Sequence, residues 1–234
     1  MQGVQALSAI NSRPTAVVIA DQLRESIIIG AFGPGDQINE AQVANQLNVS
    51  RGPVREALHR LVQEGLLLSR PNRGVFVQEL TVRDVAEVYE AREVIECAAA
   101  EIITKMLPED RARIVDGMRP IIDRMHAPLA RDDWAQLGRI DLEFHTALVS
   151  SAGNTRLARA YSTLATESLI CLSSFPSAYP EPDRVIVGHT EIAELLLEGS
   201  MQQLHLALHR HLSLDDYELR SSGEDDALRH GRNE

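Results

Sequence analysis

The sequence predicts a mainly α-helical protein of two domains, an N-terminal winged helix-turn-helix and a C-terminal all-α bundle of six or seven helices. Three observations support this fold class. The chain has 234 residues, more than the ~100–200 residues of a typical single domain. Up to about residue 80, three helical patterns are followed by one hairpin pattern. After residue 81, helical periodicity continues and strand signals disappear.

The first helical pattern covers residues 15–29, where apolar side chains recur at helical spacing, and it stops at Gly30, a residue that terminates helices. The segment "FGPGDQI" that follows is typical of a turn. A short second helix is predicted over residues 40–47. Together these segments form the first part of a small helical domain.

The third helix is predicted over residues 51–64. Ser50 suits its N-cap and Pro53 its first turn, where a missing amide hydrogen costs little. Gly65 ends it. Two short apolar runs then surround "PNRG", which predicts a hairpin with its tip at residues 71–74. Three helices and a two-stranded wing make a winged helix-turn-helix.

The third helix has two different faces. One is apolar and is expected to pack on the first two helices; it carries Val54, Leu58, Leu61 and Val62. Arg51, Arg55 and His59 follow the flank of that face. Arginines at a helix N-terminus suit phosphate, and they can also form paired hydrogen bonds to guanine. Periodicity alone leaves a second interpretation equally open, a solvated helix whose arginines pair with Glu56 and Glu64.

Charge is distributed unevenly along the chain, whose net charge is −11. Residues 1–78 contain seven arginines and six acidic residues, for a net charge of +1, whereas residues 79–234 contain 16 basic and 28 acidic residues, for −12. A local basic region on an acidic body is typical of a small nucleic-acid-binding surface. This asymmetry favours DNA binding by the third helix.

Residues 23–77 resemble the N-terminal domain of the GntR family of bacterial transcription regulators, most clearly in "VSRGPVREAL", "EGL" and "RGVFV". The resemblance implies that Ser50, Arg51 and Arg55 contact operator DNA and that Arg73 and Gly74, at the wing tip, enter the minor groove. This sequence departs from the family pattern at Gly52, where threonine is common, and at Ala41 and Gln42, where some members carry a contacting arginine.

The second domain is predicted to consist of helices alone. The helical segments are separated at Pro108, at Ala127–Pro128, at Gly153 and in the "FPSAYPEP" loop. Pro120 is expected to kink or shorten the helix predicted over residues 109–126. The predicted helices cover residues 82–106, 109–126, 132–151, 154–174, 184–199 and 200–220. This pattern is typical of a helical bundle.

Four polar residues fall on the apolar faces of these helices: Asp141, His145, His189 and His211. His205, by the same projection, points to solvent, as does His209. Burying a carboxylate and three imidazoles is costly unless they are paired or bind an ion. One shared site would suit Zn²⁺, and also Mn²⁺ or Ni²⁺. The alternative is that each histidine is a separately satisfied core residue.

The segments "YEAREVIECAAAEI", "DLEFHTALVSSAGN" and "GHTEIAELLLEGSMQQLHLALHRHL" resemble the metal-binding version of the FCD effector domain, found in the FadR subfamily of GntR regulators. The resemblance implies that the same four residues are the metal ligands. It also implies that Arg92, on an apolar helix face, contributes to an effector pocket, where a guanidinium would bind the carboxylate of a small organic acid. In the alternative interpretation, Arg92 only neutralises Glu96 one turn later.

Composition limits the remaining possibilities. Hydrophobic residues make up 44% and charged residues 24%, and no apolar run reaches the ~18 residues of a membrane span. No signal peptide is apparent, and Cys97 and Cys171 lack disulfide or metal spacing, which fits a reducing cytoplasm. We therefore expect a cytoplasmic protein without a membrane partner.

The sequence as a whole predicts a metabolite-responsive repressor that is not an enzyme. It is expected to bind a palindromic double-stranded operator as a homodimer, because one short recognition helix covers few base pairs. The alternatives are a metal-dependent enzyme fused to a DNA-binding domain, with Glu143 as base, and a structural DNA binder. The predicted boundaries are a flexible N-terminus over residues 1–12, the DNA-binding domain over 13–79, the effector, metal-binding and dimerisation domain over 80–221 and a disordered tail over 222–234.

Overall fold

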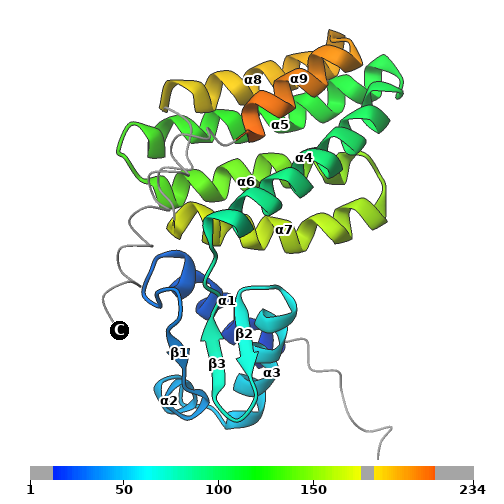
Figure 1. Cartoon of the computed structure of the whole chain (residues 1–234). Helices are drawn as coiled ribbons and strands as arrows, with labels where there is room; N and C mark the ends of the chain where they lie inside the picture. Colours follow the sequence, from blue (N-terminus) through cyan, green and yellow to red (C-terminus); the bar gives the residue numbers. More distant parts are fainter. Residues whose placement is uncertain (1–12, 175–181, 214–234) are drawn as a thin grey trace, which may run out of the picture.

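A computed structural model of the chain describes residues 13–174 and 182–213. Within them, a small domain with a three-stranded sheet lies against one side of a larger helical bundle (Figure 1). The predicted flexible N-terminus and disordered tail lie outside the described residues, as does the end of the last predicted helix beyond residue 213. Among the described residues, none of the helices has the length and apolar character needed to cross a membrane.

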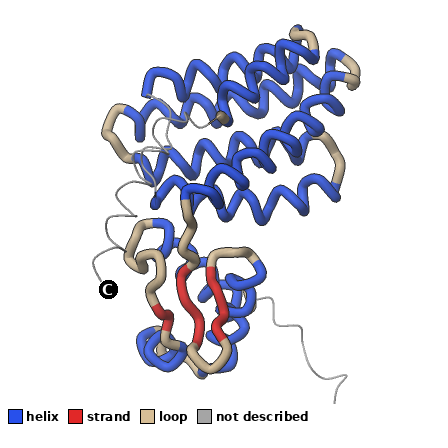
Figure 2. Tube along the Cα trace, in the orientation of Figure 1, coloured by secondary structure: helices blue, strands red, loops and turns tan. Residues whose placement is uncertain are grey.

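The small domain has the predicted order of elements, with one additional strand. Figure 2 shows its three strands between and beside short helices. The elements are α1 (Thr15–Ile28), β1 (Gln37–Ile38), α2 (Glu40–Gln46), α3 (Arg51–Gln63), β2 (Leu67–Arg70) and β3 (Gly74–Val77). The sheet order is β1-β3-β2, and both pairings are antiparallel.

The predicted two-stranded hairpin is present as β2 and β3, and the sequence analysis missed the third strand, β1. Gln37 pairs with Phe76 and Ile38 with Val75, so the end of the "FGPGDQI" segment adds β1 to the outer side of β3. A strand of two residues is too short to show the alternation of apolar and polar side chains that identifies strands in a sequence. The buried Ile38 contributes to the domain core.

Local chemistry accounts for the ends of the two helices that form the helix-turn-helix. The Asn39 side chain accepts hydrogen bonds from the backbone amides of Ala41 and Gln42 and so caps α2. Ser50 occupies the N-cap position of α3 with an extended backbone, as predicted, but its side chain makes no capping hydrogen bond. Gly65 follows α3 with a φ of +79°, a conformation that favours glycine.

The larger domain is an all-α bundle of six helices in the described part of the chain, in agreement with the prediction. Helices α4, α6 and α7 lie nearer the small domain, and α5, α8 and α9 lie on the far side (Figure 1). The helices are α4 (Val82–Thr104), α5 (Pro108–Leu129), α6 (Trp134–Ser151), α7 (Thr155–Ser174), α8 (Pro182–Glu198) and α9 (Met201–Leu212).

The predicted helix break at Ala127–Pro128 was wrong, because α5 continues through Pro120 and Pro128 to Leu129. A proline inside a helix removes one backbone hydrogen bond, and its ring crowds the carbonyl four residues earlier. The inner face of α5 is buried along its whole length, from Val115 to Pro128. Tertiary packing therefore outweighs the local effect of proline here.

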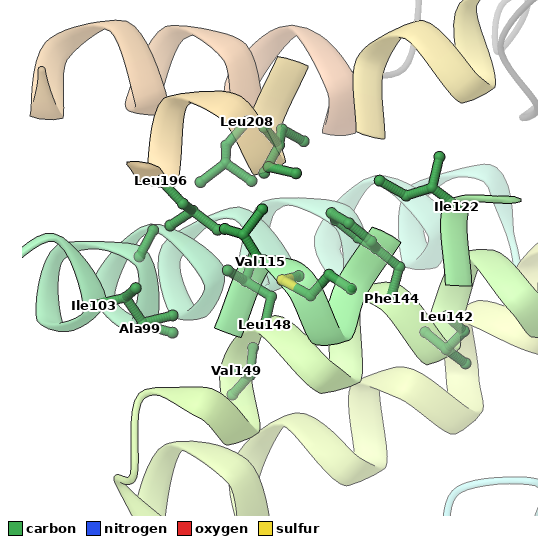
Figure 3. Close-up of a cluster of buried hydrophobic side chains, with 14 of the residues drawn as sticks. Ala99, Ile103, Val115, Ile122, Leu142, Phe144, Leu148, Val149, Leu196 and Leu208 are labelled. Carbon is green, nitrogen blue, oxygen red and sulfur yellow. The ribbon is translucent and has the colours of Figure 1, made fainter. Parts of the chain in front are cut away.

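The bundle core consists mainly of aliphatic side chains from helices on both sides of the bundle (Figure 3), together with Met118, Met125, Phe144 and Tyr161. A second, separate core fills the small domain, and it includes Ile170 from α7 of the bundle. Arg139 of α6 also forms an ion pair with Glu25 of α1, with 2.6 Å between Nη2 and Oε1. The two domains are thus joined by apolar and ionic contacts as well as by the chain.

Candidate functional site

The third helix presents its basic side chains to solvent. Its buried side chains are Val54, Ala57, Leu58 and Leu61, so Ala57 takes the place predicted for Val62, which is only partly buried. Arg51, Arg55 and His59 are all exposed on α3. The structure therefore places the predicted DNA-contacting residues on one accessible side of a helix that is anchored by its apolar face.

The alternative interpretation holds for one arginine of α3, because Arg60 Nε lies 3.8 Å from Glu64 Oε1. Arg55 instead forms two hydrogen bonds with Glu40 of α2, from Nε at 3.0 Å and from Nη2 at 2.8 Å. The hydrogen bonds from Arg55 lower the pKa of Glu40. Glu64 also pairs with Arg24 of α1, with 2.7 Å between Nη2 and Oε2. Arg51 has no ion pair within the described residues, so its charge is available to a ligand.

The wing tip is held by a contact from β1. The Gln37 side chain donates a hydrogen bond from Nε2 to the backbone carbonyl of Arg73 at 2.7 Å. Gly74 has a φ of +102°, and a Cβ atom there would lie 2.8 Å from Gln37 Nε2. Glycine therefore suits this position both by conformation and by space. The Arg73 side chain remains exposed at the tip.

The four predicted metal ligands come together inside the bundle. Asp141 and His145 of α6, His189 of α8 and His211 of α9 each offer one ligand atom, and these atoms all lie within 4.8 Å of one another. His145 and His189 are fully buried, and Asp141 and His211 are partly buried. The three histidines therefore share one cluster, and the alternative in which each has its own separate partners in the core does not hold.

Neighbouring acceptors determine which nitrogens of these rings face the cluster. His145 Nδ1 lies 2.6 Å from a carboxylate oxygen of Glu96, and His189 Nδ1 lies 2.7 Å from the backbone carbonyl of Val185. Because carboxylates and carbonyls only accept hydrogen bonds, both Nδ1 atoms must carry the proton. Each Nε2 atom then turns an unprotonated lone pair toward the cluster, as metal binding requires.

The unprotonated nitrogens have no satisfactory partner in the protein. His145 Nε2 lies 3.1 Å from His211 Nε2, so two ring nitrogens face each other. His189 Nε2 lies 3.1 Å from an oxygen of Asp141, yet it is buried without a hydrogen bond, because with the proton on Nδ1 neither atom has a hydrogen to donate. Buried polar atoms of this kind are costly unless an ion or proton lies between them. The residues present thus fit a divalent cation.

Electrostatics at the cluster also suit a cation. Burial opposes the negative charge of Asp141, but the attraction of His145, His189 and Arg92 outweighs it and lowers the pKa of Asp141 below its usual range. Burial, together with His189 and His145, lowers the pKa of His211 well below its ordinary value. The site therefore offers one carboxylate and neutral imidazoles, a donor set for Zn²⁺ and related ions.

Arg92 lies beside this cluster on α4 and is 1% exposed. Its Nε atom is 3.2 Å from Glu96, so the predicted neutralising pair exists. Its guanidinium also lies over the ring of Tyr89, 5.0 Å from the ring centre. Even so, Arg92 Nη2 is buried and has no hydrogen-bond partner. The two interpretations of Arg92 are therefore compatible, because one donor pairs with Glu96 and another is left for a ligand.

The remaining predictions about the bundle concern residues outside the cluster. His205 and His209 are exposed, as the helical projection predicted, and His209 pairs with Glu93. Glu143 is exposed and pairs with Arg124, so it faces away from the cluster and cannot act as a base there.

Sequence reasoning missed three residues of these sites. Glu40 accepts hydrogen bonds from Arg55 and so holds its guanidinium in place. Tyr161 of α7 donates a hydrogen bond from its hydroxyl to Glu96 at 2.7 Å. Gly188 adjoins His211, and an added Cβ would lie 2.7 Å from His211 Nδ1. All three act across helices, and nothing in their own sequence surroundings indicated these contacts.

Two family models match the chain, each over one of the two domains. The model described as "Bacterial regulatory proteins, gntR family" matches residues 15–77, and the model described as "FCD domain" matches residues 87–214. The second match alone covers more than half of the chain.

Several known transcriptional regulators are similar to this chain. An HTH-type transcriptional regulator of Agrobacterium vitis, from the TAR-I ttuE-ttuC′ intergenic region, is 35% identical over 56% of this chain and 76% of its own length. The gluconate operon transcriptional repressor of Bacillus subtilis is 27% identical over 77% of this chain and 74% of its own. A solved structure described as a GntR transcriptional regulator from Rhodococcus sp. RHA1 aligns with a TM-score of 0.73 and 29% identity, over 89% of this chain and 97% of that one.

Proposed function

Because the chain belongs to the GntR family of bacterial transcription regulators and carries an FCD domain, it is a DNA-binding regulator rather than an enzyme, and we propose that it is a metabolite-responsive repressor. In this proposal, a homodimer binds a palindromic operator in the cytoplasm. A small organic acid that binds beside a metal ion in the bundle then releases the DNA.

The DNA-binding residues in this proposal are those of the exposed side of α3 and of the wing tip: Ser50, Arg51, Arg55, Arg73 and Gly74. The exposed position of Arg51 and its lack of an ion pair within the described residues support this role. Arginine donors at this point of a recognition helix can bind phosphate or the edge of guanine. The free hydroxyl of Ser50 can donate to a phosphate, because it is not used as a helix cap.

The bound metal in this proposal is most consistent with zinc, with manganese or nickel as the alternatives. Asp141, His145, His189 and His211 would hold it, and the support is the chemistry of this donor set and the proximity of its four ligand atoms. When bound, the ion supplies a positive charge and open coordination positions to which carboxylate oxygens can bind. The protein contributes a buried setting in which such a contact is not screened by water.

The observation that carries the effector assignment is the buried, unpartnered Nη2 atom of Arg92 beside a cluster of metal-ligating groups. A guanidinium donor next to a cation binds anions, and a small carboxylate can use both at once. One relative is named as the repressor of a gluconate operon, and gluconate is a carboxylate. The effector class that we propose is therefore a small organic acid.

Operator binding can be tested with one arginine variant and a matched control. Arg51→Ala should weaken binding to a selected operator by about 1–3 kcal/mol for each half-site. Arg113→Ala, which removes an exposed arginine of the bundle, should leave the affinity unchanged. Fluorescence anisotropy with labelled operator DNA measures both. Wild-type affinity in Arg51→Ala would contradict the assignment of α3 as the recognition helix.

The switch can be tested on the same operator complex. Candidate organic acids are titrated against complexes of the wild type, Arg92→Ala and, as control, Arg83→Ala at an exposed position of the same helix. Arg92→Ala should bind the operator normally but need at least tenfold more acid for release, in line with the loss of a charge-assisted contact of about 1.5–3 kcal/mol. An unchanged response would remove Arg92 from the effector site.

A further inference from the structure

Glu96 is completely buried at the meeting point of three helices of the bundle. It lies on α4, one turn after Arg92, and its carboxylate receives hydrogen bonds from three different side chains. The distances are 2.6 Å to His145 Nδ1 of α6, 2.7 Å to the Tyr161 hydroxyl of α7 and 3.2 Å to Arg92 Nε. A carboxylate that only neutralised Arg92 would need neither of the other two contacts.

The two oxygens of Glu96 serve different neighbours. One oxygen, Oε2, faces His145, whereas Oε1 accepts from both Arg92 and Tyr161. Arg92, whose guanidinium can only donate, and the Tyr161 hydroxyl both donate to the same oxygen, as expected for a carboxylate. The two contacts to Oε1 hold the carboxylate in one orientation. This orientation places Oε2 where it accepts the hydrogen bond from His145 Nδ1.

The consequence for His145 is a defined tautomer and ring orientation. Because Glu96 can only accept, His145 carries its proton on Nδ1 and turns Nε2 toward Asp141 and His211. A carboxylate behind a ligating histidine also increases the basicity of the ligating nitrogen. Glu96 takes only the Nε donor of Arg92, so it leaves Nη2 available to a ligand.

We propose that Glu96 is a positioning residue of the metal centre, which presents Nε2 of His145 to the ion, rather than a simple counter-charge for Arg92. The inference rests on the proposed metal site. It makes a specific claim about this carboxylate: the distance from Glu96 to His145 matters, and the negative charge alone is not sufficient.

Two substitutions separate positioning from charge. Glu96→Gln removes the charge but keeps the length of the side chain, whereas Glu96→Asp keeps the charge and withdraws the oxygens from His145. Glu93→Gln is the matched control, because Glu93 lies on the same helix and also pairs with a histidine, His209, at 3.0 Å on the exposed side. The positioning role predicts that both Glu96 variants are impaired and that Glu93→Gln is not.

The experiment uses full-length protein freed of metal and titrated with Co²⁺, whose visible absorption reports the number and geometry of its ligands. Both Glu96 variants should bind Co²⁺ about 10–100-fold more weakly than the wild type and should give an altered spectrum. Wild-type affinity and spectrum in Glu96→Asp would overturn the inference, because charge would then be sufficient. A wild type that binds no Co²⁺ would instead overturn the metal site itself, and the inference with it.

A second measurement does not depend on the folding of any variant. Nitrogen chemical shifts of the histidine rings in the metal-free wild type distinguish the two neutral tautomers. We expect the neutral His145 ring to carry its proton on Nδ1, which faces Glu96. A ring protonated on Nε2 would overturn the inference whatever the variants do, because Nε2 would then not be presented to an ion.

Discussion

At the scale of single residues, Gly188 shows how closely two helices approach at the candidate metal centre. It lies on α8 next to His189, and an added Cβ would come within 2.7 Å of His211 Nδ1 on α9. Real Cβ atoms do not tolerate such a contact, so a larger residue must displace the His211 ring. Glycine at this position is therefore required by space rather than by backbone conformation.

Gly188→Ala should consequently weaken metal binding, because a displaced His211 can no longer complete the cluster. Elemental analysis and metal titration of the purified variant measure this. Gly117→Ala is the control, since nothing lies within 4 Å of an added Cβ at that helical position. The control should bind metal normally and gain about 0.5–1 kcal/mol of stability. Equal metal binding in both variants would show that His211 is not a ligand.

The residues of the site were predictable to different degrees. Asp141 and the three clustered histidines could be found because each breaks the apolar pattern of its own helix, and that pattern is local in sequence. Tyr161 and Gly188 could not, because their roles depend on which residue of another helix lies opposite. Of the two interpretations of Arg92, the pairing with Glu96 is present in the structure, whereas the effector role stays a prediction, with the unpartnered Nη2 donor as its support.

At the scale of elements, the start of α4 is defined by a reciprocal cap. The Thr81 side chain accepts a hydrogen bond from the backbone amide of Asp84, and the Asp84 side chain accepts from the backbone amide and the hydroxyl of Thr81. This capping box satisfies amides that the first helical turn leaves unpaired. It is placed where the chain leaves the small domain and enters the bundle.

Thr81→Ala should lower the free energy of unfolding by about 1 kcal/mol, the usual contribution of an N-cap. The hydrogen bonds from Thr81 lower the pKa of Asp84 below 3.8. Because this pKa is lower in the folded than in the unfolded state, the contribution is present above about pH 3.8 and is lost as the pH falls through the folded value. The difference between wild type and variant should therefore shrink in acid.

Urea denaturation of both proteins, repeated from neutral to acidic pH, measures this difference. Ser162→Ala is the control, because the exposed Ser162 hydroxyl lies within α7 and bonds only a carbonyl of the same helix. It should change stability by less than about 0.5 kcal/mol at any pH. A Thr81→Ala effect that is absent, or that grows in acid, would contradict the role assigned to the cap.

Elements, more than single residues, could be predicted from the sequence. Every described helix was anticipated, because apolar periodicity over more than one turn is a local signal. The exceptions have physical causes. β1 is too short to carry a pattern, and α5 continues through Pro128 because its inner face is buried against the rest of the bundle. Both depend on partners that are distant in sequence.

At the scale of the whole molecule, α7 connects the bundle to the DNA-binding domain. Tyr161 on this helix bonds Glu96 beside the candidate metal centre, and Ile170, 2% exposed, packs into the core of the small domain. A rigid helix thus contacts the surroundings of the site near one end and the DNA-binding domain near the other. The helix α7 therefore has contacts with both regions.

Ile170→Ala should destabilise the small domain although the substituted residue belongs to the bundle. A cavity of this kind costs about 2–5 kcal/mol. Amide hydrogen exchange should accelerate chiefly in residues 15–77. Ile192→Ala, within the bundle core, is the control and should accelerate exchange in the bundle instead. Acceleration confined to the bundle in both variants would show that the Ile170 contact contributes no stability.

Ile170 and its neighbour Cys171 pack into different cores, Ile170 with the small domain and Cys171 with Tyr89 and Leu212 of the bundle. The spatial boundary between the domains therefore runs past the C-terminal part of α7, far in sequence from the junction near residue 80 where the chain passes between them. This has a consequence for chimeras and for recombination between relatives. A DNA-binding domain transplanted at the sequence junction leaves behind one side chain of its own core, so exchanges should succeed only where the recipient carries a residue of similar size and shape at position 170.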